Sequence, residues 1–289
     1  MKDLGRLKYF LGIEVLRSKR GIFMSQRKYI LDMLTETSLV DCKSVETPIV
    51  VNHGLKMIEG AELADKERYQ RLIGKLIYLS HTRPDIAYAV GVLSQFMHSP
   101  QKDHLEAAVR LVRYLKGTVG KGVLFKKHGH LEIEGYTDAD WAGNPVDRRS
   151  TSGYFTLVGG NLITWKSKKQ KVVALSSAEA EFRGIARGLA EVLWLRKLMG
   201  EIGFPSCSPC KLKCDNRAAI SISENPVQHN RMKHIEVDRH FIKEKLESKV
   251  VCLPHVKSSE QLADILTKTV PCPFFREVLG KLSIEDPIT

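Results

Sequence analysis

Two segments of this chain alternate apolar and polar residues and then end on an aspartate. From Leu131 to Asp138 the apolar positions fall on every second residue, which is the period of a β-strand with one buried face. From Lys211 to Cys214 the same alternation leads directly to Asp215. Side chains at strand ends can leave the edge of a sheet and meet there. The pattern therefore predicts a sheet in which two carboxylates, far apart in the chain, can converge.

A helix is predicted between these two strands. Ser176, followed three residues later by Glu179, forms a capping box, which marks a helix start. Glu181 lies in the opening turns and shares a face with Gly184 and Gly188, whose missing side chains would let the helix approach a strand closely. Apolar residues continue at helical spacing at Phe182, Ile185, Ala186, Leu189, Val192 and Leu193. The helix therefore offers a third carboxylate.

A fourth carboxylate, Asp264, lies in the segment 262–266, which we expect to be helical. Water attacks a phosphodiester when a nucleophile is made near neutral pH and the leaving oxygen is stabilised, and two Mg²⁺ ions about 4 Å apart supply both. Mg²⁺ prefers oxygen ligands, so carboxylates suit it. Asp138, Glu181, Asp215 and Asp264 together therefore predict a metal-dependent nuclease site.

Each acid also has a simpler interpretation. A single Asp or Glu is most often a solvated surface group. Asp140, Glu179 and Asp238 lie close enough in sequence to the chosen acids to replace or assist one of them. Lys268, four residues after Asp264, offers that acid an ordinary surface ion pair.

The order of these features resembles the ribonuclease H family. Thr137-Asp138 is followed by Gly143-Asn144-Pro145, then by a helix acid, a strand-end Asp and a helix Asp. Seven segments narrow the resemblance to the pol polyprotein of copia-type LTR retrotransposons. They lie at residues 7–14, 72–79, 82–86, 93–97, 113–118, 176–181 and 263–268. The resemblance covers nearly the whole chain and implies the end of a reverse transcriptase followed by its ribonuclease H domain.

The resemblance implies an α/β fold: a ribonuclease H-like mixed five-stranded sheet with flanking helices, preceded by a mainly helical remnant of the reverse transcriptase thumb and connection. We expect the palm end, thumb and connection at residues 1–125, the ribonuclease H domain at 126–272 and a C-terminal tail at 273–289. Besides the elements above, residue patterns predict strands at 9–16, 153–158, 161–165, 171–175 and 250–256, with hairpins at 18–21 and 159–160. They predict helices at 26–35, 67–79, 86–97, 105–116 and 234–246.

The implied activity is hydrolysis of the RNA strand of RNA–DNA hybrids with two Mg²⁺ ions, for which Mn²⁺ can substitute. The resemblance assigns Asp138 to both ions, Glu181 and Asp215 to one ion and Asp264 to the other. Its implied partners are the hybrid and other retrotransposon pol products. The alternative is a catalytically silent relic that binds nucleic acid and keeps its acids.

Two features depart from the family pattern. The polymerase Asp-Asp pair of the family precedes the segment that begins here at Leu4-Gly5, and only Met1-Lys2-Asp3 stand before it, so no polymerase activity is expected. Many cellular ribonucleases H carry a His in a loop before the last acid. Here His255 lies on a predicted strand that runs almost directly into the helix of Asp264. We therefore assign no residue to proton shuttling.

Charge and cysteine content limit the partners. The net charge is +12, and both parts are basic: residues 1–125 carry 20 Lys and Arg against 13 Asp and Glu, and the rest carries 25 against 20. This charge favours binding to a polyanion such as a nucleic acid.

No apolar run or signal-like N-terminus indicates a membrane or secretion, so we expect an intracellular protein, cytoplasmic or nuclear. Six scattered cysteines indicate reduced thiols. Cys207, Cys210 and Cys214 with His229, His234, His240 or His255 leave a zinc module as a weaker alternative.

Overall fold

The computed structural model describes residues 5–206, 208–224 and 236–287, with the side chains of 236–238 left out. The chain divides into two compact units. Unit 1 comprises Met1–Lys127 and Thr269–Thr289, and unit 2 comprises His128–Lys268. Residues 273–289, expected as a separate tail, thus belong to unit 1. Among the described residues, no helix combines the length and apolar character needed to cross a bilayer.

Unit 1 contains an antiparallel sheet that the sequence predicted only in part. Its strands, in spatial order, are β1 (Tyr9–Phe10), β2 (Ile13–Ser18), β3 (Gly21–Ser25), β4 (Gly122–Phe125) and β10 (Ile284–Glu285). The hairpin at 18–21 is confirmed. The single strand expected at 9–16 is interrupted because Leu11 and Gly12 both have positive φ, 47° and 77°. A Cβ at Gly122 would overlap the Met24 carbonyl, so glycine allows β4 to lie against β3.

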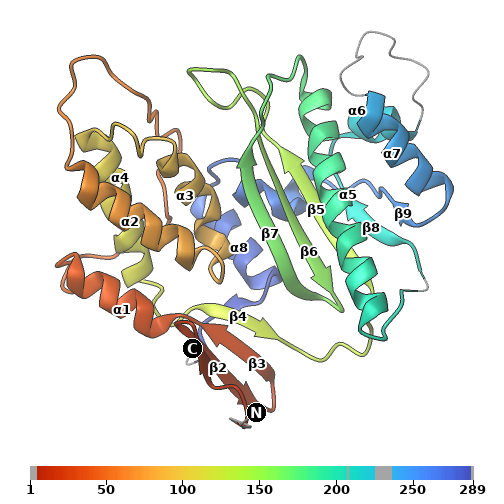
Figure 1. The fold of residues 1–289 in the computed structure, drawn as a ribbon, viewed down its shortest axis with the longest axis horizontal. Coiled ribbons are helices and arrows are strands. Elements are labelled where there is room, and N and C mark those ends of the chain that lie inside the picture. Colours follow the sequence, from red (N-terminus) through yellow and green to blue (C-terminus); the bar gives the residue numbers. More distant parts are fainter. Residues whose placement is uncertain (1–4, 207, 225–235, 288–289) are drawn as a thin grey trace. The chain divides into compact units, whose positions relative to one another are not determined.

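In the described part of unit 1 five helices accompany this sheet, and the four that the sequence predicted in residues 1–125 are confirmed (Figure 1). They are α1 (Arg27–Glu36), α2 (Lys66–Leu79), α3 (Ala87–Ser94), which follows the 3₁₀ turn η1 (Pro84–Ile86), α4 (Lys102–Lys116) and α8 (Cys272–Lys281). Asp65 caps α2 by accepting a hydrogen bond from the Arg68 amide at 3.0 Å. The apolar faces of α2 and α4 are buried, as their helical spacing requires.

Unit 2 is built on the expected mixed five-stranded sheet. Its strands, in spatial order, are β7 (Asn161–Lys169), β6 (Thr151–Val158), β5 (Ile133–Ala139), β8 (Cys210–Lys213) and β9 (Val251–Cys252). The first three are antiparallel, whereas β5, β8 and β9 run parallel. The hairpin at Gly159–Gly160 is confirmed by positive φ at both glycines. The strand expected at 171–175 is wrong, because β7 itself continues to Lys169 and the chain then turns.

The helices of unit 2 are α5 (Ser177–Glu201), α6 (Arg217–Glu224) and α7 (Glu236–Glu247). The Ser176 side chain caps α5, accepting from the Glu179 amide at 3.1 Å. Helix α5 packs on β5 and β6 (Figure 1). A Cβ at Gly184 would lie 3.2 Å from Thr137 Oγ1, and one at Gly188 would lie 3.1 Å from a Leu212 methyl group. The predicted close approach of this helix face to the sheet is thus confirmed.

Of the last two expected elements of unit 2, the strand is shorter than predicted and the helix is of another type. β9 covers only Val251–Cys252, and His255 adds an isolated parallel bridge to Cys214. Asp264 lies on a 3₁₀ helix, η5 (Leu262–Leu266), rather than on an α-helix. The Gln261 side chain caps η5 by accepting from the Ala263 amide at 3.2 Å. The tight turn therefore results from a local cap that helical periodicity does not reveal.

Candidate active site

Asp138 lies near the end of β5 and is buried, with 2% of its surface exposed. Its neighbour in register on β6 is Gly153. A Cβ at Gly153 would lie 2.5 Å from Leu266 Cβ, so the glycine allows η5 to lie directly on β6. This approach places Thr267, whose hydroxyl donates a hydrogen bond to Asp138 Oδ2. Lys268 Nζ lies 3.8 Å from the same oxygen.

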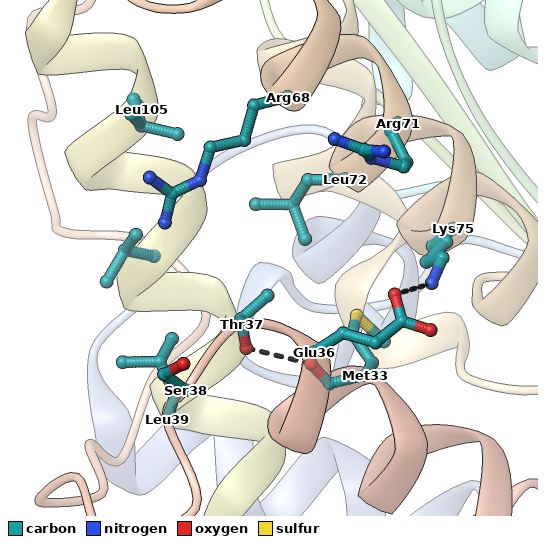
Figure 2. A pocket seen from close by; sticks show the side chains of 11 residues that line it. Met33, Glu36, Thr37, Ser38, Leu39, Arg68, Arg71, Leu72, Lys75 and Leu105 are labelled. Atoms are coloured by element: carbon teal, nitrogen blue, oxygen red, sulfur yellow. Dashed lines mark hydrogen bonds and ion pairs between the residues drawn. The ribbon is translucent and has the colours of Figure 1, made fainter.

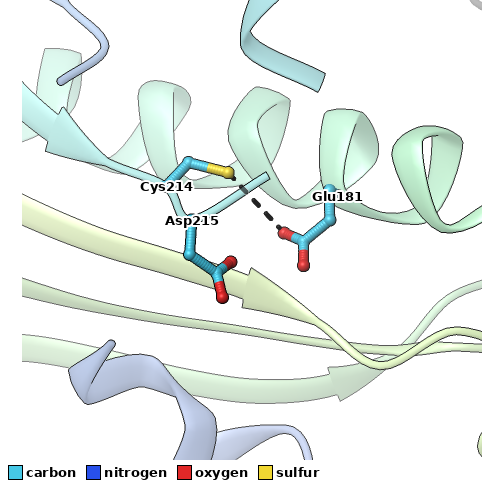
Figure 3. A group of neighbouring side chains, drawn as sticks. All are labelled: Glu181, Cys214 and Asp215. Atoms are coloured by element: carbon cyan, nitrogen blue, oxygen red, sulfur yellow. Dashed lines mark hydrogen bonds between the residues drawn. The ribbon is translucent and has the colours of Figure 1, made fainter. Parts of the chain in front are cut away.

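Glu181 reaches the same place from α5. It lies in the second turn of the helix and is 5% exposed. Figure 3 shows it facing the end of β8, where Cys214 Sγ donates to Glu181 Oε2 at 3.8 Å. Potential ligand atoms of Glu181, Cys214 and Asp215 lie within 4.8 Å of one another. Helix α5 and strand β8 thus bring two of the four acids together.

Asp215 lies two residues beyond the last residue of β8, after Cys214, and is half-buried. Ser258 Oγ donates to Asp215 Oδ2 at 2.7 Å. His255 Nε2 lies 3.2 Å from the backbone oxygen of Asp215, not from its carboxylate. The histidine therefore supports the chain at the strand end, and the structure gives it no contact with the acidic groups.

Asp264 is 7% exposed, and Lys268 Nζ lies 2.8 Å from its Oδ1. The expected lysine pair exists, but it joins a buried acid that also neighbours Asp138. Gln261 fixes this segment to the sheet, since its side-chain amide donates to Thr137 O at 2.9 Å. Gln261 and Thr267 are thus positioning residues that sequence patterns did not indicate, whereas the pairing of Lys268 with Asp264 was expected.

The four carboxylates form one electrostatic group, which we call the acid cluster (Asp138, Glu181, Asp215 and Asp264). Burial, followed by the charges of Asp138 and Asp215, raises the pKa of Glu181 far above its usual value. Burial and Asp138 also raise the pKa of Asp264, although Lys268 opposes the rise. Among the described residues, Lys268 is the cation that pairs with these acids. Acidic side chains therefore outnumber cationic ones in this largely buried place, and the donors are carboxylate oxygens, the set that Mg²⁺ or Mn²⁺ prefers.

The acids named as substitutes differ in their surroundings. Asp140 is half-buried and accepts a hydrogen bond from the Thr151 amide, and burial with the charge of Asp138 raises its pKa to about 7. Glu179 accepts from the Leu175 amide at 2.8 Å and pairs with Arg183 at 2.9 Å, so it stabilises the start of α5. The side chain of Asp238 lies outside the described residues.

The cysteines do not form the zinc site considered above within the described part of the chain. Cys207, His229 and His234 lie outside it. Cys210 is buried in the core, where Arg196 Nη1 donates a hydrogen bond to its sulfur at 3.9 Å. Burial and the charge of Glu181 raise the pKa of Cys214, which keeps it a neutral hydrogen-bond donor. The described cysteines, Cys42, Cys210, Cys214, Cys252 and Cys272, are free thiols.

The topology of unit 2 is that of a ribonuclease H-like α/β fold, with three antiparallel strands, two parallel strands and α5 packed on the sheet. No family model matches the chain. It is 44% identical over 284 residues to the retrovirus-related Pol polyprotein from transposon RE1 of Arabidopsis thaliana, covering 98% of this chain and 19% of the relative. It is 38% identical over 280 residues to the one from transposon TNT 1-94 of Nicotiana tabacum, covering 94% and 21%.

The chain belongs to the family of retrovirus-related Pol polyproteins of transposons. It spans about a fifth of the length of these relatives. Among solved structures, it is similar to LC11-RNase H1 in complex with an RNA/DNA hybrid, with 16% identity and a TM-score of 0.36, covering 47% of this chain and 94% of that one.

Proposed function

We propose that this chain is a metal-dependent endonuclease that hydrolyses the RNA strand of RNA–DNA hybrids. The observation that carries the proposal is the acid cluster, in which carboxylates from β5, α5, the segment after β8 and η5 lie together, with only Lys268 paired to them among the described residues. Sequence similarity to transposon Pol polyproteins supports the choice of nucleic acid as substrate. We further propose that unit 2 is the nuclease domain, because it contains all four acids.

Each acid of the cluster would have its own role in metal binding. Asp138 would hold both of two Mg²⁺ ions, Glu181 and Asp215 would hold one, and Asp264 would hold the other, with Mn²⁺ able to replace them. When bound, the metal pair lowers the pKa of water and stabilises charge on the departing 3′ oxygen. Thr267 and Ser258 fix the carboxylates of Asp138 and Asp215 through hydrogen bonds. Such partners orient ligands before the metal arrives.

The hybrid is the substrate that fits this family best. A reverse transcriptase product pairs RNA with DNA, and a protein distinguishes the RNA strand by its 2′-hydroxyl groups, which the wide minor groove displays. The net charge of +12 favours binding to such a polyanion.

Cleavage of end-labelled duplexes by the full chain tests the proposal. The RNA strand of a hybrid should be cut internally with Mg²⁺ or Mn²⁺ and should stay intact with EDTA. DNA duplexes of the same sequence should not be cut. Hybrid binding without any metal-dependent cleavage would instead support a catalytically silent relic, and tightly bound zinc with no cleavage would support a zinc module.

A further inference from the structure

Exposed apolar side chains lie on two segments of unit 2 that lead to acids of the cluster. Trp141, just after β5, is 53% exposed, and Leu175, in the segment before α5, is 81% exposed. Val172 and Val173, on the same segment as Leu175, are exposed as well. We call these four residues the apolar rim. Contiguous apolar surface that stays exposed is typical of a binding surface.

The two segments of the apolar rim are joined at Trp141. Its indole N–H donates a hydrogen bond to the Ala174 backbone oxygen at 3.1 Å. The following amide, that of Ala142, donates to Ser150 Oγ at 3.1 Å, which fixes the turn after the tryptophan. The indole is thus held through its polar edge, while about half of the residue stays exposed. A rigid aromatic ring that is held in this way can stack on another flat ring at a low entropic cost.

The apolar rim borders the acid cluster through a small core of three alanines. Ala139, Ala174 and Ala180 pack together. Ala139 directly follows Asp138 on β5, and Ala180 directly precedes Glu181 on α5. The segment 172–175 therefore packs against the immediate neighbours of two acids of the cluster.

Chain geometry limits the distance between the apolar rim and the acids. Trp141 is three residues after Asp138, so their Cα atoms lie within about 11 Å of each other. The Leu175 amide donates to Glu179 Oε2 at 2.8 Å, two residues before Glu181 on α5. Successive nucleotides of a stacked strand are roughly 3.4 Å apart along its axis. When a phosphate lies at the acid cluster, a neighbouring nucleotide of the same strand can therefore reach the apolar rim.

We propose that Trp141 stacks on the base of an unpaired nucleotide beside the scissile bond. The identity of the nucleic acid rests on the proposed function. Bases inside a duplex already stack on each other, so without opening that stack a protein ring contacts the face of a base only where pairing stops. Aromatic side chains hold single-stranded nucleotides by such stacking. The preferred substrate is thus a hybrid whose RNA strand continues unpaired next to the cleavage position, and Trp141 is a positioning residue.

The cavity of unit 1 shown in Figure 2, of about 480 Å³, offers no comparable contact. Its cations, Arg68, Arg71 and Lys75, all come from α2, and Lys75 is paired with Glu36 of α1. Its described lining contains no aromatic side chain. The cavity can attract an anion, but it has no flat surface on which a base could stack.

Hybrid binding tests the stacking role of Trp141. Anisotropy in EDTA compares a blunt labelled hybrid with hybrids whose RNA strand carries an unpaired extension at the 5′ or at the 3′ end. The wild-type chain should bind one of the extended hybrids more tightly than the blunt one. Trp141→Ala should lose roughly 5- to 150-fold in affinity for that hybrid and keep its affinity for the blunt one, because stacking on one base contributes this much. Trp141→Phe keeps an aromatic ring and should retain most of the affinity.

Trp194→Ala is the matched control. Trp194 is 52% exposed, nearly as much as Trp141, but it lies thirteen residues after Glu181 on α5, which is about 20 Å along the helix axis. This variant should bind every hybrid like the wild type. Circular dichroism checks that each variant is folded.

The outcomes separate this inference from the proposed function. If the chain cleaves hybrids with Mg²⁺ but neither the wild type nor Trp141→Ala distinguishes extended from blunt hybrids, the stacking role is overturned and the nuclease stands. If the chain does not cleave but Trp141→Ala alone loses the preference for an extended hybrid, the stacking role stands and the nuclease proposal fails.

Two further results would overturn the stacking role. An equal loss of affinity for blunt and extended hybrids would mean that the indole packs on the duplex itself. A loss in Trp141→Phe as large as in Trp141→Ala would mean that the hydrogen bond to Ala174, and not the ring, carries the effect.

Discussion

Unit 1 and unit 2 both bury charged groups, but unit 1 pairs its buried acid with a cation, whereas unit 2 buries more acids than cations. In unit 1 the side chains of Arg83 and Asp85 are fully buried and paired at 2.6 Å. Tyr114 Oη donates to Asp85 at 2.6 Å, and Arg83 donates to Thr118 O at 3.0 Å. Burial alone would raise the pKa of Asp85, but the charge and hydrogen bonds of Arg83 lower it below its usual value. We call this group the buried pair.

The acid cluster of unit 2 lacks such a balance. Burial and the negative charge of Asp138 raise the pKa values of Glu181 and Asp264, which means that the metal-free fold opposes their ionisation. A buried ion pair whose hydrogen bonds are satisfied is a structural feature. A buried excess of carboxylates is a cost that a bound divalent cation removes. The contrast thus separates a group that stabilises the fold from one that we propose to bind metal.

The largest expected effect is on catalysis. Asp215→Asn keeps the size of the side chain but removes the charge that would hold Mg²⁺, so hybrid cleavage should fall by more than the roughly 10- to 100-fold effect of losing an outer-shell partner. Binding of the hybrid in EDTA should stay unchanged or become slightly tighter, because the change relieves repulsion of phosphate. Single-turnover cleavage and anisotropy measure the two effects. Unchanged cleavage would remove Asp215 from the site.

The next effect is on the stability of unit 1. Arg83→Met leaves Asp85 buried without a counter-charge, and such a loss costs about 3 to 5 kcal/mol of unfolding free energy. Urea denaturation followed by hydrogen exchange in α2 and α4 measures it. The double variant Arg83→Met/Asp85→Leu is the control, and it should recover most of the loss because no unpaired charge remains. A single variant as stable as the wild type would contradict the structural role of the pair.

A smaller effect is expected when metal is added. Mg²⁺ that binds only the folded cluster stabilises unit 2 by about 2.7 kcal/mol at one hundred times its dissociation constant. Hydrogen exchange in β5 and β8 should slow with Mg²⁺, whereas exchange around the buried pair should not change. Asp138→Asn should remove the protection in β5. Equal protection in both units would indicate that Mg²⁺ acts through general screening.

The acid cluster and the buried pair also differ in how much of each could be predicted from the sequence. Period-two alternation placed Asp138 and Asp215 at strand ends, and the capping box placed Glu181, because each signal is local. The contacts of Gln261 and Thr267 depend on η5 meeting the sheet across more than 120 positions of sequence, which no local pattern encodes. Arg83 and Asp85 were noted only as part of a family segment, since nothing near them in sequence shows that Tyr114 and Thr118 would surround them. β4 was missed because its residues, Gly122–Phe125, do not alternate between apolar and polar side chains, and β10 was missed because two residues carry no pattern of their own.

The last expected effect is a pH dependence of opposite sign in the two units. The pKa of Asp85 is lowered on folding, so its stabilisation is present above its unfolded value near 3.8 and is lost only as the pH falls below that. The pKa of Asp140, beside the acid cluster, is raised to about 7, and that of Asp264 is raised as well. The metal-free fold therefore binds more protons than the unfolded chain, and unit 2 should lose stability as the pH rises from about 4 through 7.

Protection factors, corrected for intrinsic exchange at each pH, should fall in β5 over this range but stay level in α4. Saturating Mg²⁺ should flatten the change in β5, since the cation then supplies the missing positive charge; an unchanged slope would mean that the acids are balanced by groups other than a metal.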